Sequence, residues 1–348
     1  MSTLFKKRHT ELFITQAGFD SSSAKMVEIG DLLLAMYGAT SGDIAVSKIK
    51  GAINQAILCI RTKQNKKFIE SVWNKHVSKN LRKYLQGGQG NLSADIIKGI
   101  SFSFPTLKEQ EKIANLVSLL DERIATQNKI IDKLQSLIKG LEDNLLDNPL
   151  WEKTYLRSFM QFFSTNSLSW EQLSYEEGEI RNLHYGLIHG FQTRSINSVS
   201  LPMIKNEAIP KQYTLCQVGD VAFADASEDT GEIAKSVEFV DTIEGDTICG
   251  LHTIHGRDIK NRTVVGFKGF AFNSRYFHNQ IKRLAQGTKV FSITANNLSS
   301  CYVYLPDFDT QKAIVKLLKA YEEKLLVSKR LLEQYEKQKQ YLLRQMFI

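Results

Sequence analysis

The chain contains one long pattern twice, as FPTLKEQEKIANLVSLLDERIATQNKIIDKLQSLIKGLEDNLL at residues 104–146 and as LPDFDTQKAIVKLLKAYEEKLLVSKRLLEQYEKQKQYLLRQMF at residues 305–347. An offset of 201 residues places Pro105 on Pro306 and Gln110 on Gln311. Because an internal repeat constrains the architecture of a whole chain, the two copies predict two equivalent structural units.

Each copy predicts one long helix with a narrow apolar stripe. In the first copy, seam residues recur alternately every four and three residues from Ile113 to Leu145, which is the heptad pattern of a coiled coil. About 40 residues at 1.5 Å per residue would form a rod of roughly 60 Å. A stripe this narrow requires a partner helix, and we expect the other copy to provide it. The predicted seam includes Leu120, Ile124, Gln127, Ile131 and Leu134, then Leu325, Ser328, Leu332, Tyr335 and Leu342.

Two polar residues, Gln127 and Ser328, occupy the same seam position. A polar pair at such a position can fix the register of a coiled coil at some cost in stability. The alternative is that the two helices are unrelated, each packing on its own domain.

The repeat extends beyond the helices. VEIGDLLLAMYGATSGDIA (27–45) matches CQVGDVAFADASEDTGEIA (216–234), with Gly30 on Gly219, Asp31 on Asp220, Gly42 on Gly231 and Ala45 on Ala234. Alternating apolar residues broken by glycine predict short strands and turns. A further strand, a short helix and a glycine turn follow, and a proline then closes the last strand and permits a helix start. The repeated unit is therefore a mixed α/β globule followed by a long helix, an α+β fold.

The two globules differ in length. The second extends from about residue 151 to 306, the first only from 1 to 105, and residues 151–200 have no counterpart before Gly30. We expect a shortened first domain that is either impaired or completed by another polypeptide. The predicted divisions are residues 1–105, 106–147, 148–306 and 307–348.

Composition excludes several classes of protein. No apolar run among the 348 residues approaches the ~18–20 residues of a membrane span, and no signal-peptide pattern is present. The sequence therefore predicts a cytoplasmic protein with no membrane partner. The four cysteines are scattered without a CxxC pair, which indicates neither a zinc motif nor a disulfide framework.

The net charge of +8 is unevenly distributed. Residues 1–107 hold 15 Lys and Arg against 7 Asp and Glu, whereas residues 147–306 hold 15 against 17. Local patches are more informative: residues 61–83 hold eight basic residues and one acid, and residues 268–289 hold five and none. One such patch is usually a solvated face, but two before equivalent glycine turns favour a polyanionic partner.

These features resemble the specificity (S) subunit of type I restriction–modification systems. The resemblance rests on GDLLLAMYGATSGDIA and GDVAFADASEDTGEIA, on QGNLSADIIKGISFSFPTLKEQEKIANLVSLLDERI with its second copy, and on YGLIHG (185–190). It implies two target-recognition domains, each followed by a long helix, with the helices paired antiparallel as a coiled-coil spacer. It also implies recognition of double-stranded DNA on behalf of methyltransferase (M) subunits, two being expected, and restriction/translocase (R) subunits.

Four patterns imitate catalytic or ligand-binding motifs. NPLW (148–151) lacks the second proline of an amino-methyltransferase NPP(F/Y) loop and is better explained as a helix stop. Pro306–Asp307 followed by Glu322, Glu323 and Lys324 fits the PD…ExK pattern of nucleases. That chemistry needs carboxylates that converge on a metal ion, whereas Glu322 and Glu323 lie on a predicted long helix. No carboxylate or cysteine completes a metal set with His252, His255 and His278, and GGQG (87–90) lacks the Lys-Ser/Thr of a phosphate loop. We therefore predict no catalytic residue, no cofactor and no metal.

A rigid rod would separate two recognition surfaces by one to two turns of B-DNA, and the predicted target is therefore bipartite and asymmetric. Predicted phosphate contacts come from the basic patches and glycine turns, namely Lys79, Arg82, Lys83, Gln89, Asn91, Lys282, Arg283, Thr288 and Lys289. Predicted base contacts are polar side chains on loops, namely Tyr37, Thr40, Ser41, His189, Gln192, Arg194, Ser227 and Asp229. The alternative function is a non-catalytic coiled-coil adaptor that binds protein and not DNA.

Overall fold

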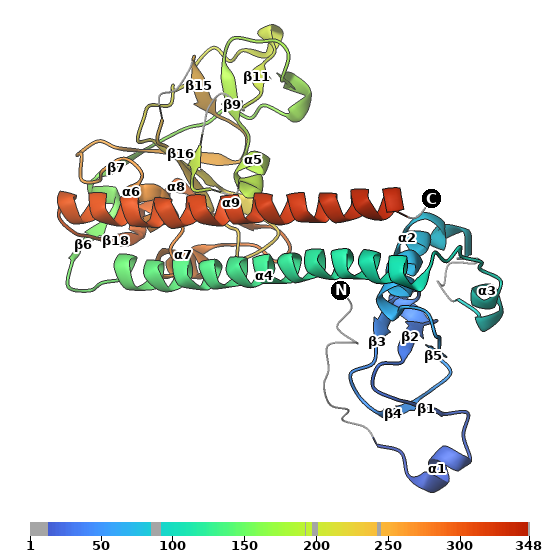
Figure 1. Cartoon of the computed structure of the whole chain (residues 1–348). Helices are drawn as coiled ribbons and strands as arrows, with labels where there is room; N and C mark the ends of the chain where they lie inside the picture. The colour runs from blue at the N-terminus through green and yellow to red at the C-terminus, as the bar shows by residue number, and fades with distance from the viewer. Residues whose placement is uncertain (1–12, 85–91, 192, 197–200, 242–244, 347–348) are drawn as a thin grey trace. The chain divides into compact units, whose positions relative to one another are not determined.

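The computed structural model describes residues 13–84, 92–191, 193–196, 201–241 and 245–346, with the backbone alone at residue 39 and over residues 77–84. The chain forms two compact units, Met1–Lys129 with Arg330–Ile348 and Ile130–Lys329. Each unit combines one globular domain with one part of each long helix (Figure 1).

The first domain is built on a three-stranded antiparallel sheet. Its central strand β2 (Leu32–Ala35) is buried along its whole length and pairs with β3 (Ile44–Val46) and β5 (Ile57–Ile60). Helix α2 (Lys66–Tyr84) packs on this sheet, and the Trp73 indole N–H donates to the Gly42 carbonyl at 2.8 Å. The remaining elements are α1 (Gln16–Asp20), β1 (Lys25–Val27), η2 (Gly38–Thr40), β4 (Gly51–Ile53) and α3 (Ala94–Lys98).

The second domain contains a larger version of this sheet, in the order β10-β14-β12-β16-β7. Its central strand β12 (Val221–Ala224) is buried throughout and lies between β14 (Ser236–Phe239) and β16 (Thr253–Asp258). The outer strands are β7 (Met160–Phe163) and β10 (Ser195–Ile196). A second sheet has the order β15-β9-β11-β8, from β8 (Leu173–Ser174), β9 (Arg181–Leu183), β11 (Met203–Ile204) and β15 (Thr247–Cys249).

Short helices and two-stranded ladders complete the second domain. Helix α7 (Arg275–Leu284) begins at Ser274, whose hydroxyl accepts the Phe277 amide N–H, and buries Phe277 and Ile281 in the core. The other elements are α5 (Tyr185–Gly190), α6 (Phe267–Ala271), α8 (Ala295–Ser300), η3 (Leu156–Ser158), η4 (Trp170–Gln172), η6 (Asn206–Ala208), β6 (Glu152–Tyr155), β13 (Ala226–Ser227), β17 (Phe291–Ser292) and β18 (Tyr302–Leu305).

The Gly-Asp pair of the repeat plays the same role in both domains. Gly30 and Gly219 adopt positive φ angles of 92° and 88°, which glycine adopts without steric cost. The aspartate that follows then accepts hydrogen bonds from an arginine on the neighbouring strand: Arg61 Nη2 lies 3.1 Å from Asp31, and Arg257 Nη2 lies 2.7 Å from Asp220. The glycine therefore shapes the turn that delivers a buried carboxylate to its arginine.

The predicted alignment of the repeats is wrong in its second half by three residues. Strand β3 pairs Leu34 with Ile44, and β14 pairs Phe223 with Ser236. The Gly42 amide donates to Ala35 as the Ala234 amide donates to Ala224, so Ala234 and not Gly231 is equivalent to Gly42. The loop of the second domain is three residues longer, which hides the correct match from an ungapped comparison.

The Pro-Gln motif anchors each long helix to its own domain. The Gln110 side chain accepts the Asn65 amide N–H at 3.0 Å and donates to the Pro105 carbonyl at 2.9 Å. The Gln311 side chain accepts the Val264 N–H at 2.9 Å and donates to the Pro306 and Arg262 carbonyls at 3.0 and 3.1 Å. Gln110 and Gln311 are both 1% exposed. Each glutamine therefore connects its long helix to its own domain through buried hydrogen bonds, and we call this connection the Gln110 or Gln311 joint.

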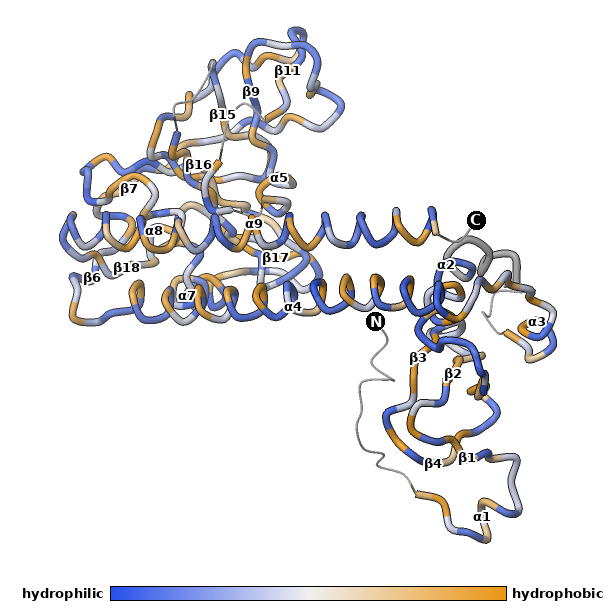
Figure 2. Tube along the Cα trace, in the orientation of Figure 1, coloured by the Kyte–Doolittle hydropathy of each residue, from blue (hydrophilic) through white to orange (hydrophobic). Residues whose placement is uncertain are grey.

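The long helices are α4 (Leu107–Leu146) and α9 (Phe308–Met346), within two residues of the predicted spans 106–147 and 307–348. Apolar and polar residues alternate along both (Figure 2). Of the predicted seam, Leu120, Gln127, Ile131, Leu134 and Ser328 are buried, and Ile124, Leu325, Leu332, Tyr335 and Leu342 are half-buried. Among the described residues, no helix combines the length and apolarity needed to cross a membrane.

The helices run antiparallel within each unit. In the first unit, Lys339 Nζ lies 2.5 Å from the Asp121 carboxylate, and the Arg123 guanidinium lies 6.0 Å from the centre of the Tyr335 ring. In the second unit, Glu142 of α4 and Glu322 of α9 contact the same arginine. Residues near the end of α4 therefore face residues near the start of α9.

The two domains differ in the strands that flank their sheets. In the second domain β14 is flanked by β10, β16 by β7, and β18 by β6. Among the residues that the structure describes, the outer edges of β3 and β5 have no strand partner, and residues 101–104, equivalent to β18, form no strand. All three covering strands of the second domain come from residues 152–196, the segment without a counterpart.

Candidate nucleic-acid interface

The loop that follows the central strand makes an equivalent backbone contact in both domains. It covers residues 36–43 in the first domain and 225–235 in the second, and it contacts Leu92 or Ile293. The Leu92 amide donates to the Met36 carbonyl at 2.7 Å, and the Ile293 amide donates to the Asp225 carbonyl at 3.0 Å. In the second domain the fold therefore brings the loop 225–235 next to residues 286–292, although the two segments are far apart in sequence.

In the second domain the glycine turn is a tight hairpin over residues 286–292. Gln286 and Ser292 exchange two backbone hydrogen bonds, and Gly287 has a φ of 127°. A Cβ atom at Gly287 would lie 2.0 Å from the Val290 carbonyl oxygen, so only glycine fits this turn. The hairpin exposes Thr288 and Lys289 and pairs through β17 with β13, which contains Ser227.

The basic side chains beside this hairpin project from the end of a helix. Lys282 and Arg283 lie in the last turn of α7, and both are exposed. Cations at a helix carboxyl terminus also interact favourably with the helix dipole, so their position has a structural benefit as well. Lys289 adds a third exposed cation in the hairpin that pairs with β13.

The loop 225–235 is held in one shape by its own polar groups. The Ser227 hydroxyl accepts the Asp229 amide N–H at 3.1 Å, and the Asp229 carboxylate accepts the Gly231 N–H at 2.7 Å. The His278 ring donates from Nε2 to the Thr230 carbonyl at 2.9 Å. Burial lowers the pKa of His278, and this effect outweighs the hydrogen bond to the Thr230 carbonyl, which raises it. The loop thus presents an exposed Asp229 and a half-buried Ser227 from a fixed backbone.

His189 also supports this loop. Its Nε2 lies 3.3 Å from the Ala226 carbonyl, and its Nδ1 lies 3.5 Å from the Glu232 carboxylate. Both ring nitrogens therefore face groups of the protein, and the base contact of His189 stays a prediction.

In the first domain the equivalent loop presents Tyr37, which is 44% exposed, and the half-buried Thr40 and Ser41. The Ser41 hydroxyl donates to the Met36 carbonyl at 2.9 Å, which favours a turn-forming role for this residue. Lys79, Arg82 and Lys83 belong to α2, but their side chains lie outside the described set, as do the whole residues Gln89, Asn91 and Gln192.

The prediction that Arg194 contacts bases conflicts with its position. Its guanidinium lies 2.6 Å from the Glu142 carboxylate and 3.0 Å from the Glu322 carboxylate. The contact with Glu142 is an ion pair without an aligned hydrogen bond. Burial raises the pKa of both glutamates, and Arg194 opposes that rise. Arg194 therefore links the domain to both helices, and its role as a base contact stays a prediction.

The structure also explains two motif imitations. The Asn148 carboxamide accepts the Leu150 amide N–H at 3.0 Å in the turn after α4, as expected of a helix stop. The Asp307 carboxylate accepts the Thr310 amide N–H at 2.9 Å at the start of α9, and this bond lowers the pKa of Asp307. Both residues thus have local structural roles.

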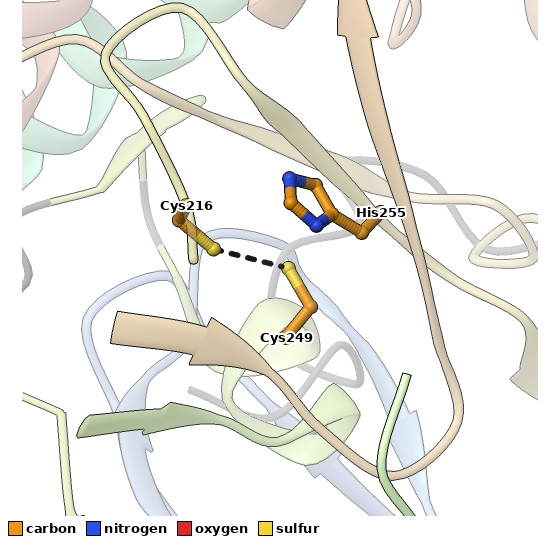
Figure 3. A group of neighbouring side chains, drawn as sticks. All are labelled: Cys216, Cys249 and His255. Atoms are coloured by element: carbon orange, nitrogen blue, oxygen red, sulfur yellow. Dashed lines mark hydrogen bonds between the residues drawn. The ribbon is translucent and has the colours of Figure 1, made fainter. Parts of the chain in front are cut away.

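The sequence analysis missed one cluster. His255 lies beside Cys216 and Cys249, so the expectation that no cysteine completes a set with this histidine is wrong (Figure 3). The His255 ring also bonds from Nε2 to the Asp220 carboxylate at 2.7 Å. Burial disfavours ionisation of Asp220, but hydrogen bonds from Arg257 and His255 outweigh it and lower the pKa of this carboxyl. No spacing rule reveals the cluster, because Cys216 and Cys249 are 33 residues apart.

The chain is similar to known proteins over most of its length. Residues 5–136 match the family described as Type I restriction modification DNA specificity domain. The type I restriction enzyme MjaVIII specificity subunit of Methanocaldococcus jannaschii is 24% identical over 337 residues, covering 90% of this chain and 77% of the relative. The putative MjaX specificity subunit of that organism is 25% identical over 336 residues, covering 89% and 76%.

Solved structures agree on the fold. The S subunit of a type I restriction–modification system from M. genitalium superposes with a TM-score of 0.58 at 15% identity, covering 93% of this chain and 84% of that one. A chain from a structure on complex assembly and conformational transition of the type I R-M system gives 0.57 at 13% identity, covering 95% and 85%. The predicted α+β fold with two long helices is confirmed. Residues 5–136 thus match the specificity-domain family, and most of the chain is similar to specificity subunits of type I restriction–modification systems.

Proposed function

We propose that this chain recognises double-stranded DNA as the non-catalytic specificity component of a type I restriction–modification complex. The observation that carries the proposal is the polar loop after each central strand, which accepts an equivalent backbone hydrogen bond, from Leu92 in the first domain and from Ile293 in the second. Two equivalent loops on domains of different sequence suit a bipartite, asymmetric target.

Phosphate contacts come from the basic side chains around the hairpin of the second domain. Lys282, Arg283 and Lys289 are exposed cations within one short stretch, and the Thr288 hydroxyl lies among them. Such contacts position a protein on DNA without reading its sequence.

Base contacts come from the loop that these cations flank. Ser227 and Asp229 occupy it in the second domain, and Tyr37 with Thr40 occupies its counterpart in the first. An aspartate can accept from the cytosine amino group, and a hydroxyl can bond to several bases. Phosphates repel Asp229 and attract Lys282, Arg283 and Lys289, so the proposal places the DNA backbone at the cations and a base edge at Asp229.

Partner subunits dock on the outer faces of the helices. Exposed residues of both signs lie there, including Glu122, Lys133, Lys316, Glu323, Arg330 and Glu336. Mixed charge suits a protein surface better than a phosphate backbone, which favours cations alone. The proposed partners are methyltransferase subunits, with restriction subunits joining the assembly.

The DNA-binding proposal is tested by the salt dependence of affinity for a random duplex. The variants Lys282→Ala and Lys289→Ala should each lower the slope of log K against log salt by about one, because each phosphate contact releases about one counterion. Lys260→Ala is the matched control, since this exposed lysine follows the opposite end of β16 from the loop 225–235. Equal slopes for all four proteins would contradict the assignment.

The adaptor alternative predicts no salt-dependent DNA binding by any variant. Docking is tested separately by reversing Lys316 and Glu323, which should abolish capture of a methyltransferase subunit and leave duplex affinity unchanged. Purified chain should transfer no methyl group and cleave no duplex. Either activity in a preparation free of partner subunits would overturn the proposal.

A further inference from the structure

Two cysteines and a histidine from three separate segments converge in the core of the second domain (Figure 3). Cys216 precedes the turn at Gly219, Cys249 ends β15, and His255 lies on β16. The Cys216 and Cys249 sulfur atoms are 3.6 Å apart, and the three ligand atoms lie within 4.8 Å of one another. All three side chains are buried.

We propose that Cys216, Cys249 and His255 bind a zinc ion. Zinc–sulfur bonds of about 2.3 Å in tetrahedral geometry place two sulfurs about 3.8 Å apart. The observed separation of 3.6 Å is close to this value. A disulfide would need the sulfurs to approach to about 2.05 Å, so the pair is spaced for a shared cation and not for a bond.

The surroundings of His255 match those of a metal-ligating histidine. Its Nε2 is held by the Asp220 carboxylate at 2.7 Å, while Figure 3 shows the other ring nitrogen on the side of the thiols. Metal-ligating histidines commonly donate their second nitrogen to a carboxylate, which fixes the ring and strengthens the ligand. Asp220 is itself fixed by Arg257 at 2.7 Å, so this outer support is already in place.

A buried hydroxyl lies on the same face. Leu215 bridges Ile248 in an antiparallel ladder, which places Cys216, Thr247 and Cys249 on one side of it. Thr247 is 1% exposed, and its hydroxyl has no hydrogen-bond partner within the described part of the chain. Buried polar groups are rarely left unsatisfied. A hydroxyl here can donate to a thiolate or complete the fourth position through a water molecule.

The charge balance also favours a divalent cation. Two thiolates neutralise a 2+ ion, and Asp220 and Arg257 form a separate neutral pair, so no net charge is buried. The simpler alternative is a pair of neutral thiols sharing a weak hydrogen bond.

The site would join the two sheets of the second domain. Cys249 belongs to the small sheet and His255 to the five-stranded sheet. The described residues of the first domain contain no equivalent: Cys59 occupies the place of His255 and contacts Asp31, and Val27 matches Cys216. Zinc would therefore stabilise one recognition domain and not the other.

The test is metal binding by the full chain, purified with its thiols reduced. Bound zinc is quantified, and the chain stripped of metal is titrated with Co²⁺, whose thiolate charge-transfer and tetrahedral d–d bands report the ligands directly. We expect one equivalent of metal per chain and loss of the bands in Cys216→Ser and Cys249→Ser. Cys301→Ser is the matched control, because this buried cysteine lies in another core cluster.

The wild-type titration keeps the proposal falsifiable even if a cysteine variant fails to fold. Absence of thiolate bands with excess Co²⁺, or a Cys216–Cys249 disulfide in the protein isolated without reductant, would overturn it. A chelator should also lower the melting temperature of the wild type and Cys301→Ser, and leave Cys249→Ser unchanged. These results are independent of whether the chain binds DNA.

Discussion

The Gln311 joint allows a quantitative test of how each helix is attached to its domain. Gln311→Met keeps the length of the side chain and a similar helix propensity, but it removes every polar atom of the joint. The Val264 N–H and the carbonyls of Arg262 and Pro306 would all lose their partner. With about 1–3 kcal/mol for each buried group left unsatisfied, and partial relief by relaxation, we expect a loss of about 3–5 kcal/mol.

The measurement is urea unfolding followed by tryptophan fluorescence and circular dichroism. Trp151 and Trp170 report on the second domain and Trp73 on the first. Gln334→Met is the matched control, because Gln334 is exposed on the same helix. If Gln311→Met costs less than about 1 kcal/mol, or no more than the control, the joint does not hold the helix and the reasoning fails.

Three further outcomes are expected. Ile131→Lys should cost several kcal/mol in urea unfolding, since it places an unpaired charge at a buried seam position, whereas Leu137→Lys at an exposed position should be tolerated. The lowered pKa of Asp220 stabilises the fold at pH values above the ordinary aspartate pKa of 3.8, and this contribution is lost as pH falls through the lower folded value. Asp220→Asn should therefore be less stable than wild type at neutral pH, and the difference should shrink in acid. If the difference stays constant with pH, Asp220 is not the titrating group. Limited proteolysis should cut within residues 1–105 before residues 151–306, because the outer edges of β3 and β5 have no strand partner among the described residues; equal resistance would show that these edges are protected.

Most of the fold could be predicted from the sequence because short patterns of neighbouring residues determine its helices and turns. The heptad spacing marked both long helices to within two residues, and the Gly-Asp pair marked the equivalent turns. The three-residue insertion in the loop 225–235 was missed, because matching glycines were available at the wrong place. Sequence patterns locate glycines, but only the strand register shows which position needs a positive φ.

The candidate site was predictable only in part. The sequence located the loop and the hairpin, but it contained no sign that Ile293 bonds to Asp225 and thereby joins them. Arg194 looked like an exposed loop residue, whereas two glutamates more than 100 residues apart converge on it. The cysteine–histidine cluster was invisible for the same reason, since contacts between distant segments depend on the completed fold.

The Gln311 joint has a consequence for exchanging domains between chains. All three of its hydrogen bonds end on backbone atoms, at Val264, Arg262 and Pro306. A joint of this kind does not depend on the side chains of the domain that it holds, provided that the chain passes the same three points. The helix can therefore carry domains of very different sequence without any change to its first turn. A chimaera that keeps the proline, the glutamine five residues later and the backbone path of residues 262–264 would retain all three hydrogen bonds of the joint. New specificities could then be built by substituting whole domains, without redesign of the rod.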